Sequence, residues 1–280
     1  MKIRSALAPI FFLAIAHAGL STAAEPAAEA AVMEHAAAAL GGKERLLGLR
    51  SIRIEGHGQI AYQDGGGNAS GSPTSAQKWI NLNGVQRTID LQNNRMRLEQ
   101  RQVHDFVFAY ARNMTGQVRA HQVLDGEIAW NIDAQGNAVR VGAPAARARR
   151  IEMYANPIVL VRKAIEPGSR VKLSNLRREG DLQVLDVETP QGDKLTFAVN
   201  ERTGFPAWSR WVAPQENVGE WTLTQYFNGY QRWNDVYFPS SYNTLADWRN
   251  VPVYKLYTDR SSINVEFADM AAPAPVRSAP

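Results

Sequence analysis

Alternation of apolar and polar residues is the dominant pattern from residue 51 onward. In residues 127–133, Ile128, Trp130 and Ile132 alternate with polar or small residues. A period of two places such side chains on one face of a β-strand, because successive residues of a strand point to opposite faces. The same pattern, interrupted by short polar turns, predicts strands over residues 51–62, 77–83, 86–91, 95–101, 104–111, 117–124, 127–133, 138–141, 170–176, 182–189, 194–200, 205–211, 220–227, 236–242, 253–259 and 262–267.

Helical patterns are predicted in two parts of the chain. The segment "AAVMEHAAAALGGKERLLGLR" predicts an alanine-rich helix that ends at Gly41 and Gly42, followed by a short helical turn. The segment "APAARARRIEMYANPIVLVRKAIEPG" predicts a pair of helices. Asn156 can cap the second of them, and Pro157 fits its first turn, where a missing N–H costs nothing.

The order of these elements predicts a mainly antiparallel β fold with a few helices. Consecutive strands joined by short turns form an antiparallel meander, which must bury one face while the other stays in water. The helices are the natural cover for that face. We therefore expect a strongly curved sheet, an incomplete barrel, wrapped around a helical lid or plug.

The first 24 residues have the features of an export signal. Lys2 and Arg4 precede a short apolar run, and small residues precede Glu25. The organisation expected is a signal peptide over 1–24, a single half-barrel domain over 25–268, and a disordered Pro/Ala-rich tail or linker over 269–280. After signal removal we expect a soluble periplasmic protein, which has no cysteine for disulfides or a thiolate metal site.

The charge balance predicts no particular partner. The net charge of +4 falls to +2 when Lys2 and Arg4 leave with the signal, which has no acidic residue (4 − 2 = 2). Arg147, Arg149 and Arg150 form the one dense basic cluster, which we interpret as a solvated helix face. The sequence therefore favours a monomer that does not bind nucleic acid.

The segment "WNIDAQGNAVRVG" resembles a calcium loop at its first, third, fifth and sixth positions, but it is better explained as a hairpin. The twelfth position is Gly142, where such a loop needs a bidentate Glu. The flanks alternate with period two, and residues 133–137 supply the Gly and Asx residues of a turn.

Other catalytic or metal-binding patterns are weak. The histidines after the signal are too far apart in the sequence to suggest a metal site. The segment "SAQK" at Ser75 has the spacing of a serine–lysine pair, but it lies between a loop and a strand. Asp186 with Glu188, or Asp125 with Glu127, could share a strand face, although nothing else converges on either pair. We therefore expect no enzyme activity, no metal and no cofactor.

Large apolar side chains recur at alternate strand positions, and two interpretations stay open. Each strand taken alone suggests an ordinary core, whereas a long sheet under two short helices suggests an underfilled cavity that holds a lipid chain. In the second interpretation the Trp130 face lies under the 157–165 helix. The cavity candidates are Met96, Leu98, Phe106, Phe108, Tyr110, Ile128, Trp130, Ile132, Leu160, Phe197, Trp221 and Leu223.

Several segments resemble the periplasmic lipoprotein carriers and outer-membrane lipoprotein-sorting (LolA/LolB-like) proteins. These are "ALGGKERL" leading into "LRSIRIEGHG", the strand "DGEIAW", the segment "LDVETPQGDKLTFAVNERTGFP" and the late "YFNGYQRWNDVYFPSSY". The resemblance covers about residues 30–268. It implies an incomplete antiparallel barrel with a helical lid over an apolar cavity that takes acyl chains.

A second set of segments is similar to the N-terminal domain of exported metallo-β-lactamase-fold hydrolases. These segments are "ALGGKERLLGLRSIRIEG", "RRIEMYANPIVLVRKAIEPG" and "FADMAAPAP". The closely spaced zinc ligands of such hydrolases do not occur in this sequence. Two functions remain open: a periplasmic protein that binds an apolar or lipid-like ligand, with a possible membrane partner, and a non-catalytic accessory domain for a hydrolase.

Overall fold

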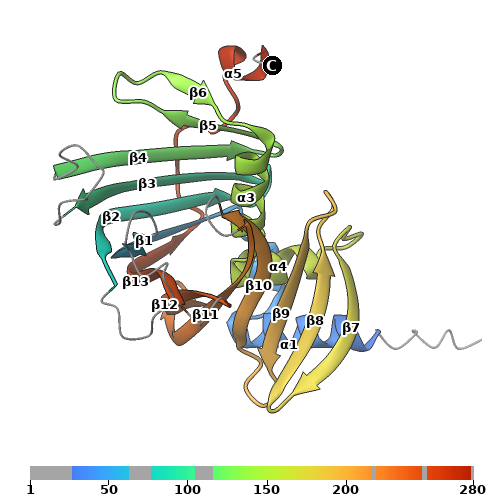
Figure 1. Ribbon diagram of the computed structural model, residues 1–280. Helices are drawn as coiled ribbons and strands as arrows, with labels where there is room; N and C mark the ends of the chain where they lie inside the picture. Colours follow the sequence, from blue (N-terminus) through green and yellow to red (C-terminus); the bar gives the residue numbers. More distant parts are fainter. Residues whose placement is uncertain (1–26, 63–76, 105–115, 216–218, 248–250, 279–280) are drawn as a thin grey trace, which may run out of the picture.

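All the strands in the described residues belong to one open antiparallel sheet. The computed structural model describes residues 27–62, 77–104, 116–215, 219–247 and 251–278. The strand order is β6-β5-β4-β3-β2-β1-β13-β12-β11-β10-β9-β8-β7, so the sheet has two free ends, β6 and β7 (Figure 1). The predicted fold class, an incomplete barrel with helices inside the curve, is confirmed.

The sheet consists of two meanders. The first contains β1 (Ser51–Ala61), β2 (Trp79–Asp90), β3 (Arg95–His104), β4 (Gly116–Asp125), β5 (Ile128–Ile132) and β6 (Ala138–Arg140). The second contains β7 (Lys172–Glu179), β8 (Leu182–Glu188), β9 (Lys194–Asn200), β10 (Pro206–Gln215), β11 (Gly219–Trp233), β12 (Val236–Ala246) and β13 (Val251–Ile263). They join where β1 pairs with β13.

Two glycines explain the close join between the meanders. A Cβ atom on Gly56 would lie 2.0 Å from the Tyr257 carbonyl oxygen, and one on Gly58 would lie 2.0 Å from the Lys255 carbonyl oxygen. Only glycine lets the β13 backbone approach so closely. The register of β1 with β13 shifts at Gly56, as a bulge does when it bends a sheet.

Two pairs of predicted strands are single strands in the structure. Residues 77–83 and 86–91 both fall in β2, where Gly84 has a φ of 57° at a shift in register. Residues 253–259 and the first two residues of the predicted strand 262–267 both fall in β13, whereas 264–267 are not part of a strand. A bulge and a turn use the same residue types, so the sequence alone does not distinguish them. The predicted strand 104–111 lies outside the described residues after His104.

The helices in the described residues are α1 (Ala28–Leu40), α2 (Lys43–Leu47), α3 (Ala143–Tyr154), α4 (Pro157–Ile165) and α5 (Ala274–Ser278). Four of these five helices lie where the sequence predicted them, and α5 falls in the segment predicted to be a tail or linker. The Asn156 side chain accepts hydrogen bonds from Ile158 N at 3.0 Å and Val159 N at 3.4 Å, which confirms the predicted cap of α4.

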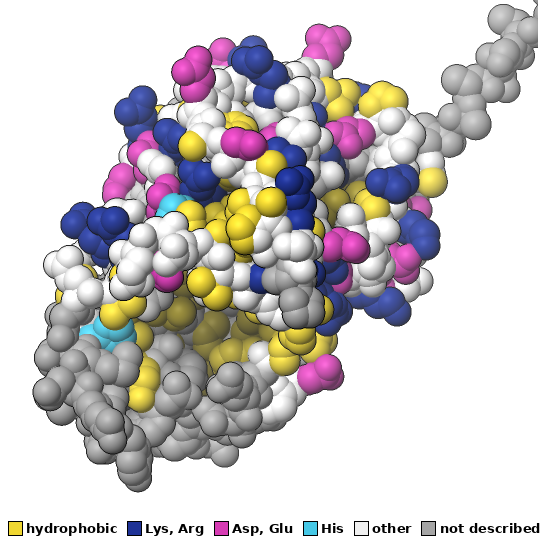
Figure 2. Space-filling model, turned by 90° about the horizontal axis from the view of Figure 1, so that it is seen from above, with side chains coloured by type: hydrophobic (Ala, Val, Ile, Leu, Met, Phe, Trp, Pro, Cys, Tyr) yellow, Lys and Arg dark blue, Asp and Glu magenta, His cyan; other side chains and the backbone are white. Residues whose placement is uncertain are grey.

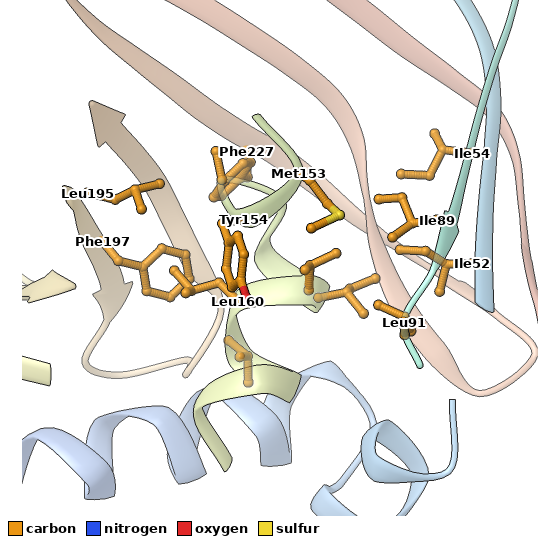
Figure 3. Close-up of a cluster of buried hydrophobic side chains, with 14 of the residues drawn as sticks. Ile52, Ile54, Ile89, Leu91, Met153, Tyr154, Leu160, Leu195, Phe197 and Phe227 are labelled. Atoms are coloured by element: carbon orange, nitrogen blue, oxygen red, sulfur yellow. The ribbon is translucent and has the colours of Figure 1, made fainter. Parts of the chain in front are cut away.

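Helices α1 and α4 fill the narrow part of the curve with a solid core. In Figure 3, Tyr154 and Leu160 lie between side chains of β9 and side chains of β1 and β2. Tyr154, Leu160 and Phe197 are at most 2% exposed. The core around α4 is therefore filled and leaves no space for a ligand beside Leu160.

Candidate functional site

A pocket opens on the concave side of the sheet, beside α3. Its volume is about 300 Å³. We call it the concave pocket, and its lining is Ile60, Ala61, Ala148, Glu152, Trp211, Ala213, Trp221, Leu223, Gln225, Thr244, Val253 and Tyr254. A hollow with a hydrophobic floor is visible in Figure 2, with Lys and Arg side chains beside it.

Strand register places the aromatic wall of this pocket. Trp211 pairs with Leu223 and Ala213 pairs with Trp221 across β10 and β11, so all four side chains share the inner face. Trp221 and Leu223 are only half-buried. Large apolar side chains that line an accessible concavity are typical of sites for apolar ligands.

A second cavity adjoins the concave pocket. We call it the rim cleft; its volume is about 670 Å³, and it lies between β5–β6, the first turns of α3 and the second half of β10. Ala148, Trp211 and Ala213 line both cavities. The two cavities together provide an apolar interior with an opening beside α3.

The polar end of the concave pocket is electrically balanced. The buried Arg87 guanidinium forms an ion pair with Glu152 of α3. Burial alone would lower the Arg87 pKa, but Glu152 and the neighbouring Tyr254 and Tyr242 raise it above its usual value, so the pair stays ionised. Burial raises the pKa of Tyr254 to about 12, which keeps this phenol neutral. The Arg87–Glu152 pair therefore presents no net charge to a ligand in the concave pocket.

Helix α3 bridges the two meanders through its arginines. Arg149 Nη1 donates to the carbonyl oxygens of Val123 at 3.1 Å and Trp130 at 2.8 Å. On the other side, Arg150 Nε lies 2.6 Å from Asp193 Oδ2, and Arg147 Nε lies 2.9 Å from Asp193 Oδ1. The interpretation of this cluster as a solvated face is wrong for Arg149 and Arg150, which are both 8% exposed.

The predicted cavity residues divide into four groups. Trp221 and Leu223 line the concave pocket. Leu160 and Phe197 belong to the solid core, as do Met96 and Leu98. Phe106, Phe108 and Tyr110 lie outside the described residues. The last group, Ile128, Trp130 and Ile132, packs in one cluster on the other side of the sheet, and Ile128 also lines the rim cleft.

The C-terminal segment covers the Trp130 face. Trp130 is 3% exposed and clusters with Val123, Met270, Ala272 and Val276. The prediction that Trp130 lies under the 157–165 helix is therefore wrong, and the described part of the 269–280 segment is not a disordered tail (Figure 1). The segment docks because its few apolar side chains match the apolar side of β4–β6, which would otherwise face water.

Polar contacts fix the same segment in place. Arg95 Nε donates to Asp125 Oδ1 at 2.8 Å, and the other oxygen of Asp125 accepts from Ala272 N at 2.8 Å. Arg97 Nη2 donates to the Asp269 carbonyl at 3.1 Å. Asp125 therefore holds the C-terminal segment against the sheet, by linking Arg95 to the backbone of Ala272.

The sequence missed the residues that complete the concave pocket. Trp211, Ala148, Tyr254 and Gln225 come from β10, α3, β13 and β11. Trp211 lies in a predicted strand, where apolar and polar residues alternate as they do around Trp221. This alternation could have predicted that Trp211 points to the inner face. Ala148 has no such signal, because only the position of α3 across the open sheet brings it to the pocket.

The remaining chemical candidates have structural partners. Asp133 Oδ1 accepts from Gln135 N at 2.9 Å and from Asn137 N at 2.8 Å, which confirms the β5–β6 hairpin. Asp186 pairs with Arg177, and Glu188 with Lys172. Ser75 lies outside the described residues. Within the described ranges there is no group of three or more His, Asp or Glu side chains placed to hold a metal ion.

Comparisons with known proteins give likeness in structure only. No family model matches the sequence, and no curated protein matches it. Within the described residues, no helix has the length and apolar character needed to span a membrane.

Three solved structures resemble most of the chain at low identity. A LolA superfamily protein from Nitrosomonas europaea is 11% identical and has a TM-score of 0.49, with 86% of this chain and 96% of that chain covered. A DUF1329 family protein from Desulfovibrio piger is 9% identical, with a TM-score of 0.45 and coverage of 86% and 95%. LprF from Mycobacterium bovis is 12% identical, with a TM-score of 0.30 and coverage of 85% and 97%.

Proposed function

We propose that the protein binds an apolar ligand, the acyl chain of a lipid, in the concave pocket, and acts outside the cytoplasm as a carrier or sensor. The observation that supports this proposal is the half-buried wall of Trp221 and Leu223 beside Trp211. These side chains face open space on the concave side, whereas Leu160 and Phe197 are packed completely. A chain that enters this space gains about 0.8 kcal/mol for each buried methylene group.

Export is part of the same proposal. The basic start and apolar run before Glu25 support removal of residues 1–24. Intact mass spectrometry of periplasmic material should show the loss of these residues. Full-length protein that stays in the membrane pellet would contradict this part of the proposal.

Ala148 offers a test that leaves the core untouched. Its side chain is exposed and lines both cavities, so Ala148→Phe should fill the space where they meet. Ala145 lies on the same helix, is also exposed and lines neither cavity, which makes Ala145→Phe the matched control. The measurement is the affinity of each full-length variant for a fluorescent acyl probe, after native mass spectrometry and lipid extraction of the purified protein.

We expect Ala148→Phe to weaken probe binding at least about tenfold, because steric exclusion removes several buried methylene groups. Ala145→Phe should bind as the unmodified protein does. Absence of probe binding by folded, unmodified and delipidated protein would refute the proposal. That result would favour the alternative of a filled accessory domain that serves a hydrolase.

A further inference from the structure

The rim cleft combines an apolar floor with a basic edge. Its apolar part includes Ile151, Trp211 and Val212, and Val212 is 47% exposed. Arg140 and Arg147 line the same cleft. An apolar concavity with arginines at its edge suits a molecule that has a chain and an acidic group.

The charges at this edge do not cancel. Arg140, Arg147 and Arg150 line the rim cleft with Glu127. Asp193, which does not line the cleft, pairs with both Arg147 and Arg150. Two guanidinium groups therefore share one carboxylate (2 − 1 = 1), so this part of the edge favours an anion.

Arg147 is the best placed of these groups to contact a ligand. Its side chain is 53% exposed, whereas that of Arg150 is 10% exposed. The bond to Asp193 uses Nε. A guanidinium has five N–H donors in a fixed fork, so an acid group can bind to the remaining ones.

Arg147 lies next to the concave pocket because it is adjacent in sequence to Ala148. Arg147 directly precedes Ala148, which lies where the rim cleft and the concave pocket meet. One turn further along α3, Glu152 lines the concave pocket and is paired with Arg87. A charged group is therefore favoured beside Arg147 and not beside Glu152.

From this arrangement we infer that the ligand is an anionic amphiphile, with its acid group at Arg147 in the rim cleft and its acyl chain in the concave pocket. The inference rests on the proposed function and adds the class and the orientation of the ligand. The shared chemistry is a carboxylate or a phosphate monoester on a single chain. Both are recognised by arginine through charge-assisted hydrogen bonds.

Matched probes separate the inference from the proposed function. Dodecanol, dodecanoate and dodecyl phosphate have the same chain and differ in the head group. Their affinities for the full-length, delipidated protein are measured by calorimetry at low and high sodium chloride. We expect at least one of the two acids to bind about tenfold more tightly than the alcohol, because hydrogen bonds to charged groups are the stronger ones. This preference should shrink as salt screens the exposed arginine.

Arg147→Gln and Arg178→Gln form a matched pair of variants. Arg178 is also exposed and ion-paired, with Glu201, but it lies on the edge strand β7, away from both cavities. We expect Arg147→Gln to reduce the ratio of acid to alcohol affinity about fivefold or more, and Arg178→Gln to preserve it.

The outcomes are distinguishable. A preference for either acid or for both supports the inference, and a preference for one acid alone identifies the acid group. Equal affinity for all three probes, or an unchanged ratio in Arg147→Gln, overturns the inference while the proposed function stands. Binding of no probe by the folded protein overturns both.

Discussion

The packing of the C-terminal segment against Trp130 predicts how much stability is lost when either side is truncated. Met270 is 1% exposed and Trp130 is 3% exposed in the same cluster. Truncation of a buried Met to Ala costs about 2–5 kcal/mol, and truncation of a buried Trp costs about 3–5 kcal/mol. Local unfolding of a docked segment limits the stability that one of its residues can contribute, so we expect Met270→Ala to cost about 2 kcal/mol, near the lower limit.

A double-mutant cycle tests whether the two residues stabilise each other. If they do, Trp130→Ala should cost less in the Met270→Ala background, with a coupling energy of about 1–2 kcal/mol. Met33 is an equally buried methionine, but it belongs to the large core under α1. The cycle of Trp130→Ala with Met33→Ala should therefore be additive.

The assay is urea unfolding of the full-length protein, followed by circular dichroism and tryptophan fluorescence. If the costs of Trp130→Ala and Met270→Ala are additive within about 0.5 kcal/mol, the claim that the C-terminal segment docks on Trp130 is refuted. A coupling as large in the Met33 cycle would show that the effect is not specific to the dock.

Three further predictions concern the rest of the fold. Asp193→Asn should lower the free energy of unfolding by about 3 kcal/mol, because it leaves the buried Arg150 without its carboxylate; the urea midpoint measures this. Burial lowers the pKa of His121 in the folded protein, a shift that Arg97 and Arg119 increase and Glu99 opposes. Stability should thus fall as the pH drops below about 6.5 and the unfolded state takes up more protons, and His121→Gln should reduce that fall. Asn156→Ala should cost about 1 kcal/mol by removing the cap of α4, as thermal unfolding will show.

Each of these predictions has its own contradicting result. Equal effects of Asp193→Asn and Glu201→Gln, which affects the exposed pair with Arg178, would show that the α3 bridge carries no extra stability. An identical pH profile for His121→Gln would remove that histidine as a cause of acid destabilisation. Equal stability of Asn156→Ala and Asn156→Asp would show that the cap is unimportant.

Local patterns predicted the elements of the fold because they depend on near neighbours in the chain. The period-two alternation gave the shared face of Ile128, Trp130 and Ile132, and Asn156 with Pro157 gave the start of α4. Gly84 was misinterpreted as a turn for a similarly local reason: a positive φ fits both a turn and a bulge.

The partners of each face could not be predicted, because they depend on contacts between distant segments. Nothing near Trp130 indicates that Met270 covers it, and a segment rich in Ala and Pro has the composition of a linker. Arg150 likewise meets Asp193 from a later turn. The concave pocket combines α3 with strands of both meanders, so only Trp221 and Leu223 among the nine candidates in the described residues line it.

Photo-crosslinking tests the central claim, the position of the ligand, most directly. A fatty acid with a diazirine group near the end of its chain is bound to the full-length protein, activated by light and located by peptide mass spectrometry. We predict crosslinks in β10 and β11 around Trp211 and Trp221, and in α3 around Ala148, all of which are lost in Ala148→Phe. Crosslinks concentrated on the Trp130–Met270 side of the sheet, or spread evenly over the surface, would contradict binding in the concave pocket.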